Sequence, residues 1–149
     1  NPKQALISGK TRLLAILGDP IEPVKSPRTW NPRLAELGHD AVLVPIHVHA
    51  AEFDAVIGSL MRLGNLDGLV LTMPFKERMI PHLASISRRA GLVGAVNAAR
   101  REPSGEWIGD MFDGVGLVGA VRGLGVEPKG LSVGLIGAGG AGSAIAFAL

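Results

Sequence analysis

The chain has 149 residues, close to the length of one average domain, and 47% of them are apolar, which provides a sizeable core and excludes a disordered chain. The formal charge is +2 and the basic residues are scattered, which excludes a concentrated nucleic-acid-binding patch. Cysteine is absent from the sequence, which excludes disulfides, thiol catalysis and cysteine-ligated zinc.

In chain order, the first predicted elements are a strand and a helix. The continuous apolar run 12–18 predicts a buried strand. A serine-proline pair, typical of the cap and first position of a helix, opens a helix over 26–38 that ends on a glycine. Pro32 interrupts this helix, so we expect either a kink or a second start capped by Asn31.

The middle of the chain continues the alternation of strand and helix. The segment 40–48 predicts a second strand, and Pro45 within it favours an edge position or a bulge. Apolar residues at helical spacing predict a helix within 50–65, and a buried strand follows at 68–72. The segment 75–80 predicts a short helix that ends before a proline.

The last third of the chain begins with two predicted strands over 94–110, joined by a Pro-Ser-Gly turn. A weakly helical segment follows over 113–125, and then come a strand over 131–136, a glycine-rich turn and the start of a helix. Strands that alternate with helices indicate an α/β fold with a largely parallel sheet. A change in composition near residue 129 predicts one domain over 1–128, with 113–125 as its connecting helix, and a second domain over 129–149.

The glycine-rich turn has the G-x-G-x-x-G spacing of a dinucleotide-binding loop. In such loops the glycines make the turn, admit a pyrophosphate and pack helix against strand, while the helix N-terminus offers N–H groups to the anion. A glycine-rich turn without a ligand is the alternative. The position about 20 residues later that would select NAD or NADP lies beyond Leu149, so both cofactors stay open and we expect a truncated form of a longer protein. The loop residues are Gly137, Ala138, Gly139, Gly140, Ala141 and Gly142.

Lys76 follows the predicted strand 68–72. A lysine at the carboxyl end of a parallel strand points into the crevice where open α/β sheets bind ligands, and there it can exchange a proton. At a helix start it also faces an unfavourable dipole, a local cost that hints at function. Asp113 is the candidate partner and Asp110 is a competitor. The plain alternatives are a surface lysine and a helix-capping aspartate.

The four histidines offer no evident metal site. His47 and His49 stand two apart, a strand spacing, with no nearby carboxylate of suitable periodicity, so no metal is expected. No run reaches the roughly 18 apolar residues of a membrane span, and no secretory signal opens the chain, which favours the cytoplasm.

Five motifs resemble, in order, those of the shikimate dehydrogenase family: LGDPIEPVKSPRTWN, GLVLTMPFKE, GAVNA, GDMFDGVG and GAGGAG. The resemblance implies an N-terminal three-layer α/β substrate domain with a mostly parallel sheet, followed by the start of a Rossmann-type nucleotide-binding domain. The active site would lie in the cleft between them. The implied reaction is reversible hydride transfer between NADP or NAD and a ring hydroxyl or ketone of shikimate, quinate or a related cyclic hydroxy acid.

The resemblance also assigns roles to individual residues. Lys76 matches the family's catalytic lysine and Asp113 its partner aspartate, which together would form an acid–base pair. Thr72 and Asn97 match positions that bind substrate hydroxyls, and Ser26 matches a serine that holds the carboxylate. The implied partner is a small cyclic hydroxy acid, bound by a monomer or homodimer, with no nucleic acid and no membrane.

Five positions around the implied substrate depart from the family's pattern, several of them from polar to apolar. A hydrogen bond to a charged group such as a carboxylate contributes about 1.5–3 kcal/mol, so these changes predict altered specificity. A non-catalytic ligand-binding or regulatory module on the same scaffold is the alternative function. The departures are Val24, Trp30, Val70, Met111 and Phe112.

Overall fold

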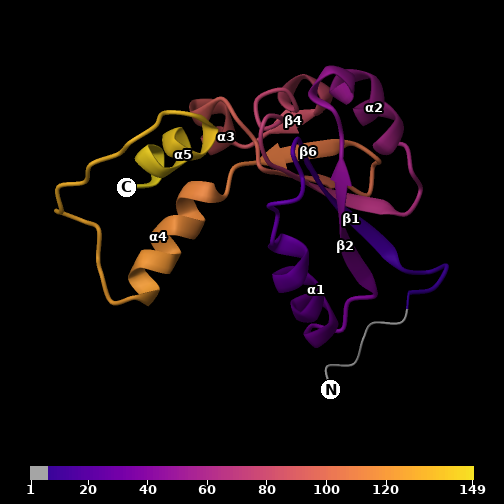
Figure 1. Ribbon diagram of the computed structural model, residues 1–149, viewed down its shortest axis with the longest axis horizontal. Coiled ribbons are helices and arrows are strands. Elements are labelled where there is room, and N and C mark those ends of the chain that lie inside the picture. The colour runs from indigo at the N-terminus through magenta and orange to yellow at the C-terminus, as the bar shows by residue number, and fades with distance from the viewer. Residues whose placement is uncertain (1–6) are drawn as a thin grey trace.

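The computed structural model describes residues 7–149, and its centre is a six-stranded sheet in the order β2-β1-β3-β5-β6-β4 (Figure 1). Every strand that the sequence predicts between residues 12 and 110 is confirmed. The bounds are Arg12–Gly18 (β1), Ala41–His47 (β2), Leu66–Leu71 (β3), Ser85–Ile86 (β4, which the sequence did not predict), Ala98–Arg101 (β5) and Trp107–Asp110 (β6).

Five of the six strands share one direction. β2 and β3 are parallel to β1, β5 is antiparallel to β3, β6 is antiparallel to β5, and β4 is parallel to β6. The predicted α/β fold with a mostly parallel sheet is therefore confirmed, and β5 is the strand that reverses. Pro45 lies in β2, at an edge of the sheet, where a missing N–H group is tolerated.

Helices cover both faces of the sheet around β1, and for this reason β1 is apolar after its first residue, Arg12. On one face, Ala15 and Leu17 join the main core together with Phe53 and Ile57 of α2 (Phe53–Leu60), which a short 3-10 helix η1 (Ala50–Glu52) precedes. The alternate residues, such as Ile16, face the side of α1 (Ser26–Glu36). The molecule here has three layers, with the sheet between α1 and α2.

The helix α1 differs in detail from the prediction. Lys25 occupies the cap position and Ser26 is the first helical residue, so the serine is not the cap. Pro32 does not divide the helix. Asn31 does not cap a second start, because its Nδ2 donates to the carbonyl oxygen of Leu43 at 3.1 Å and its Oδ1 accepts from the Leu43 N–H at 2.7 Å. This attachment to β2 offsets the backbone hydrogen bond that proline removes.

The chain after β3 forms a series of turns, so the short helix predicted over 75–80 is wrong. The one regular element here is a 3-10 helix, η2 (Ile80–His82), and it includes Pro81 in its first turn. Pro74 and Pro81 flank this segment, and proline removes a backbone N–H group that an α-helix uses, which disfavours an α-helix here. Lys76 therefore does not stand at a helix start, and the dipole cost inferred from the sequence does not apply.

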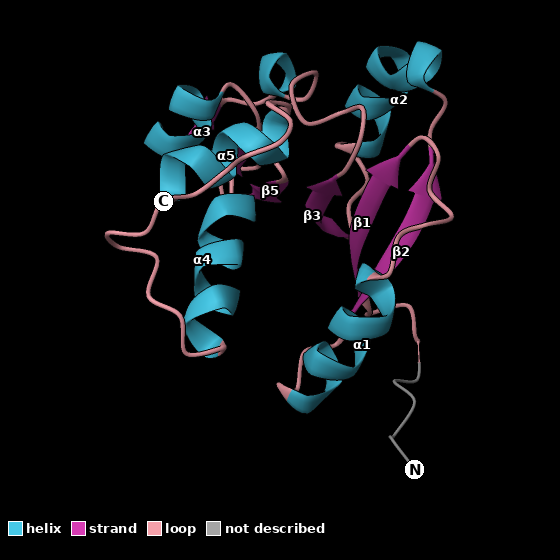
Figure 2. Cartoon of the chain, turned by 60° about the vertical axis from the view of Figure 1, so that its left-hand side comes forward, coloured by secondary structure: helices cyan, strands magenta, loops and turns pink. Residues whose placement is uncertain are grey.

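Three helices form a second group beside the sheet: α3 (Arg88–Val93), α4 (Asp113–Gly123) and α5 (Gly140–Ala148) (Figure 2). α5 packs on α3 and α4, with Ala144 buried between them. A Cβ atom at Gly114 would lie 2.0 Å from the Ala144 carbonyl oxygen, so α4 and α5 cross at backbone contact. Between residues 7 and 149, no helix has the length and apolar character needed to span a bilayer.

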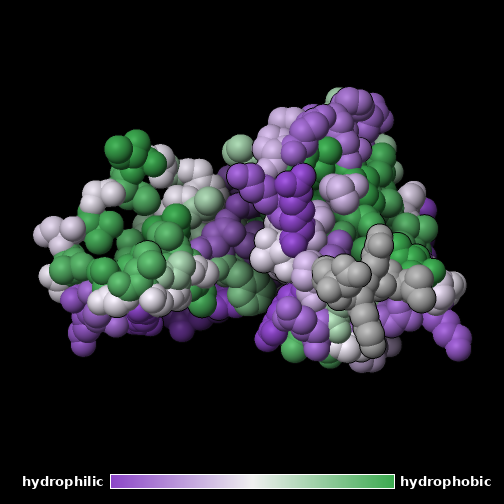
Figure 3. All heavy atoms as spheres, turned by 60° about the horizontal axis from the view of Figure 1, so that its bottom comes forward, coloured by the Kyte–Doolittle hydropathy of each residue, from purple (hydrophilic) through white to green (hydrophobic). Residues whose placement is uncertain are grey.

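The strand predicted over 131–136 does not form, and these residues are irregular. Leu135 is 44% exposed and Ile136 is fully exposed. A strand needs a neighbour to pair its backbone groups, and within the described part of the chain this segment has none. Figure 3 shows apolar side chains gathered on the surface of this C-terminal region, at the left of the view.

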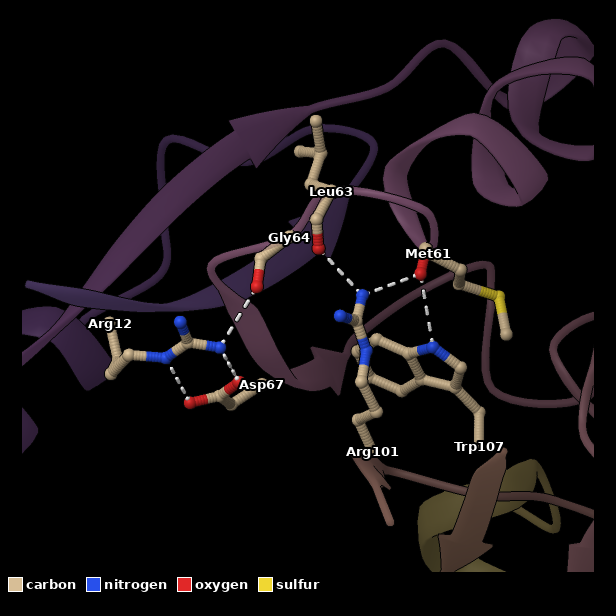
Figure 4. A network of polar contacts seen from close by, with 7 residues as sticks. All are labelled: Arg12, Met61, Leu63, Gly64, Asp67, Arg101 and Trp107. Carbon is tan, nitrogen blue, oxygen red and sulfur yellow. Dashed lines mark hydrogen bonds and ion pairs between the residues drawn. The ribbon is translucent and has the colours of Figure 1, made fainter. Parts of the chain in front are cut away.

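A polar network fastens the sheet at the edge where β1 and β3 begin and β5 ends (Figure 4). Arg101 donates to the carbonyl oxygen of Met61 at 2.6 Å, and Trp107 Nε1 donates to the same oxygen at 3.2 Å. Arg12 pairs with Asp67, its Nε lying 2.7 Å from Oδ2. A second group of polar residues lies at the opposite end of the sheet, where β1 and β3 end.

Candidate active site

The site residues implied by the sequence meet at one edge of the sheet. Thr72 and Lys76 follow β3, and Asp113 follows β6, so all three come from the carboxyl ends of parallel strands. Asn97 precedes β5, and because β5 runs the opposite way, its start lies at the same edge. Together with Ser26 of α1, these residues line a cleft of about 460 Å³. Ligands bind at this edge in open α/β sheets.

Lys76 and Asp113 form an ion pair in the cleft. Lys76 Nζ lies 2.5 Å from Asp113 Oδ2, although the two residues are 37 positions apart in sequence. Their side chains are 17% and 25% exposed, so the pair is partly shielded from water and still reachable by a ligand. The sequence allowed either Asp110 or Asp113 as the partner of Lys76, and in the structure Lys76 pairs with Asp113.

Asn97 fixes the orientation of the Asp113 carboxylate. Its Nδ2 donates to Asp113 Oδ1 at 2.5 Å, which leaves Oδ2 for the lysine. Its Oδ1 accepts from the backbone N–H of Phe112 at 2.9 Å. The backbone of Asn97 is held as well, because its N–H donates to Asp110 and its carbonyl accepts from Leu71. The Asn97 backbone thus connects the ends of β3 and β6, while its side chain holds the segment that carries Asp113.

Asp110 has partners of its own. Arg89 Nε donates to Asp110 Oδ1 at 2.6 Å, and the Ser87 hydroxyl donates to the same oxygen. Burial raises the pKa of the Asp110 carboxyl, but the hydrogen bonds from Arg89 and Ser87 outweigh burial and hold this pKa below its usual range. The Arg89 guanidinium also lies over the Phe112 ring, 4.4 Å from its centroid. No sequence pattern pointed to Arg89, because its partner lies on another element.

Three of the five departures lie in the wall of the cleft, namely Val24, Trp30 and Val70. Trp30 is 43% exposed, which leaves a large apolar surface open to a ligand. Met111 is buried and Phe112 is 46% exposed, and neither belongs to the cleft lining. The wall on the side of α1 is therefore largely apolar.

The glycine-rich turn reaches Lys76. A Cβ atom at Gly140 would lie 3.7 Å from Lys76 Cδ, so this turn lies close to the lysine side chain. Gly137 has a φ of +98°, a conformation that side chains disfavour. A Cβ atom at Gly142 would lie 2.2 Å from the Gly137 carbonyl oxygen. The turn therefore needs glycine at these two positions, although the strand predicted before it is missing.

A second polar cluster consists of Asp19, His47 and His49. One ligand atom from each residue lies within 4.8 Å of the other two. Hydrogen bonds from His47 and from the Ala50 N–H hold the pKa of the Asp19 carboxyl below its usual range. Asp19 also lines the cleft. The sequence analysis set the two histidines aside because it found no nearby carboxylate, and it missed Asp19 because this residue comes from the end of the neighbouring strand.

Comparisons with known proteins agree with this architecture. The family model for the shikimate dehydrogenase substrate binding domain matches residues 16–99. The chain is 39% identical over 136 residues to the shikimate dehydrogenase (NADP(+)) of Lysinibacillus sphaericus, across 91% of this chain and 49% of that protein. The crystal structure of shikimate dehydrogenase from Aquifex aeolicus matches with a TM-score of 0.89 and 30% identity, across 96% of this chain and 53% of the other.

A further solved structure extends the comparison to bound ligands. Shikimate 5-dehydrogenase from Listeria monocytogenes, in complex with shikimate and NAD, matches with a TM-score of 0.85 and 33% identity, across 95% of this chain and 48% of the other. The chain spans about half the length of the curated relatives it matches. The family model covers more than half of the chain and includes Ser26, Thr72, Lys76 and Asn97. The chain therefore belongs to the shikimate dehydrogenase family.

Proposed function

We propose that the full-length protein is a dehydrogenase that transfers hydride reversibly between NADP or NAD and a ring hydroxyl or ketone of shikimate, quinate or a related cyclic hydroxy acid. Family membership supports the reaction class. The L. sphaericus relative is named for NADP, and the L. monocytogenes structure holds shikimate and NAD. The observation that carries the proposal for this chain is the Lys76–Asp113 ion pair, which lies in a cleft, with the glycine-rich turn close to the lysine.

The residues over 137–142 suit the pyrophosphate of a dinucleotide. The space that a Cβ atom at Gly142 would fill is closed by the turn's own backbone, and α5 begins at Gly140 with N–H groups free of helical partners. When bound, the nicotinamide cofactor supplies or accepts the hydride. The division into a substrate domain over 1–128 and the beginning of a cofactor domain over 129–149 belongs to the same proposal.

Lys76 acts as general acid when the substrate ketone is reduced. Its ammonium gives a proton to the carbonyl oxygen while the carbonyl carbon gains hydride, so the C=O double bond becomes a C–OH group. In the reverse direction the neutral amine takes the hydroxyl proton as the carbon loses hydride. Asp113 holds Nζ in place, and Asn97 holds Asp113, which keeps the proton donor oriented.

The remaining assigned residues bind the substrate. Thr72 and Asn97 contact ring hydroxyls, and Ser26 holds a carboxylate from the α1 side of the cleft. Because Val24 next to this serine offers no hydrogen-bond donor, the carboxylate has fewer partners than two serines would provide. The proposal therefore favours related cyclic hydroxy acids as strongly as shikimate itself.

The test is steady-state kinetics of the full-length protein with shikimate, quinate and related hydroxy acids, each with NADP and NAD. Lys76→Ala is expected to lower kcat by about 10²–10⁴-fold with little change in KM, because proton transfer occurs in the transition state. Lys10→Ala, a matched change at an exposed lysine, is expected to leave both constants unchanged. Full-length protein that binds neither nucleotide in titration calorimetry refutes the proposal.

A non-catalytic ligand-binding or regulatory module is the second candidate function. The apolar wall of Val24, Trp30 and Val70 favours it, since these side chains remove polar contacts from the cleft. In that case the full-length protein shows no turnover with any member of the panel, and Lys76→Ala changes ligand affinity alone.

A further inference from the structure

We propose that Asp19, His47 and His49 form a binding site for the divalent transition-metal ion Zn²⁺. The site stands apart from the proposed hydride transfer and does not depend on it. Two imidazoles and one carboxylate are a donor set that suits zinc and its neighbours in the transition series, whereas Mg²⁺ and Ca²⁺ prefer oxygen ligands alone.

Fold topology brings these residues together. β1 and β2 are parallel neighbours, and Gly18 at the end of β1 pairs with His47 at the end of β2. Asp19 follows directly after β1, so it lies beside His47 although the two are 28 positions apart. His49 follows two positions after His47, in an extended conformation with φ −61° and ψ 136°. The backbone hydrogen bond from the Val48 N–H to the Gly18 carbonyl closes the strand pair here.

The distances are close to those of a metal centre. Asp19 Oδ1 and His47 Nε2 are 2.8 Å apart. Two donor atoms that bind one zinc ion at about 2.0–2.1 Å stand about 2.9–3.4 Å from each other, so this pair needs little movement. The ligand atom of His49 lies within 4.8 Å of both, and its ring centroid is 4.8 Å from that of His47. Because the His49 side chain is exposed, it can rotate inward without disturbing the core.

The carboxylate is already oriented for this role. The backbone N–H of Ala50 donates to Asp19 Oδ2 at 2.8 Å, which leaves Oδ1 turned toward His47. A hydrogen bond to the second oxygen of a ligating carboxylate is a typical supporting contact of metal sites. Asp19 directly follows β1 and Ala50 is the first residue of η1, so both partners of this hydrogen bond adjoin regular elements.

Three protein ligands leave a coordination position open. Asp19 also lines the cleft that holds Lys76 and Asp113, whereas His47 and His49 are not among the lining residues, so a bound ion would lie beside that cleft. A water molecule or an oxygen atom of a small ligand suits that position.

The experiment titrates Zn²⁺ alone into the full-length protein by calorimetry, in a buffer that does not chelate metals. We expect one saturable equivalent, with affinity lowered about tenfold or more in His47→Ala and in His49→Ala. His39→Ala, a matched change at an exposed histidine outside the cluster, is expected to bind Zn²⁺ as the unchanged protein does. A second readout is the visible absorption of bound Co²⁺, which should weaken in the same two variants.

Circular dichroism of each variant separates lost ligands from lost folding. His49→Ala is the safest variant, because its side chain is exposed and no hydrogen bond to it is present among the described residues. The absence of a saturable equivalent overturns the proposal. Equal affinity in folded His49→Ala and in the unchanged protein also overturns it, as does an equal loss in His39→Ala.

Discussion

Replacing Gly114 by alanine tests the close crossing of α4 and α5. The added Cβ atom would lie 2.0 Å from the carbonyl oxygen of Ala144 and 2.8 Å from the Cβ of Ala148, whereas ordinary contact begins at 3.4 Å. The nearest approach falls short by 1.4 Å, the difference between 3.4 and 2.0 Å. Because the obstructing atom is backbone, no change of rotamer relieves the clash, and we expect a loss of about 1–3 kcal/mol in the free energy of unfolding.

Gly119→Ala is the matched control on the same helix. A Cβ atom there meets nothing within 4 Å, and alanine stabilises a helix interior by about 0.5–1 kcal/mol relative to glycine. The two substitutions are therefore expected to change stability in opposite directions, which urea unfolding measures directly. Amide hydrogen exchange should also show α5 less protected in Gly114→Ala. Equal stability of the two variants, with unchanged exchange in α5, would refute the close crossing.

Two further predictions concern the edge of the sheet where the cleft lies. Asn97→Ala removes a hydrogen-bond donor that lies 2.5 Å from the Asp113 carboxylate, so we expect the free energy of unfolding to fall by about 1.5–3 kcal/mol. Urea unfolding measures this change, and an unchanged midpoint would contradict the prediction. Although burial raises the pKa of the Asp110 carboxyl, hydrogen bonds from Arg89 and Ser87 hold this pKa below its ordinary value of 3.8 in the folded protein. The ionised carboxylate therefore stabilises the folded state above pH 3.8, and this contribution is lost as the pH falls through the lower folded-state pKa. Asp110→Asn should be less stable at neutral pH and lose less stability on acidification, and parallel unfolding titrations with equal slopes would argue against this account.

The sequence was sufficient for elements that local chemistry determines. Continuous apolar runs located β1, β2 and β3, and the Pro-Ser-Gly turn located the hairpin of β5 and β6, because strand burial and turn geometry are local properties. Pro45 correctly indicated an edge strand, since a sheet interior disfavours a missing N–H group.

The failures have a common physical origin in contacts far away in sequence. Asparagine is a residue type that often caps helices, but the Asn31 side chain hydrogen-bonds to the backbone of β2 instead, and α1 continues through Pro32. The run 131–136 has the composition of a buried strand, yet a strand forms only against a neighbour. The helix predicted over 113–125 ends at Gly123, and it buries Val118 while Leu124, directly after it, is 83% exposed.

In the candidate site, too, local sequence patterns were insufficient wherever a contact joins residues that are far apart in sequence. Resemblance to a family named Lys76 and Asp113, but no local pattern could join them across 37 residues. The structure joins them because β3 and β6 end at the same edge of one sheet. The carboxylate of Asp19 was missed for the corresponding reason, since its histidine neighbours belong to the adjacent strand.

The reversed direction of β5 has a consequence for engineering the protein. Because β5 begins beside the cleft and runs away from it, the hairpin turn over 102–106 lies at the far end of the sheet, and residues 103–106 are exposed. An affinity tag or a fluorescent reporter grafted into that turn would sit remote from the chemistry, and loop tips of this kind accept insertions readily. The hairpin thus offers an attachment point for immobilising the protein on a sensor while the reacting groups still face the solution.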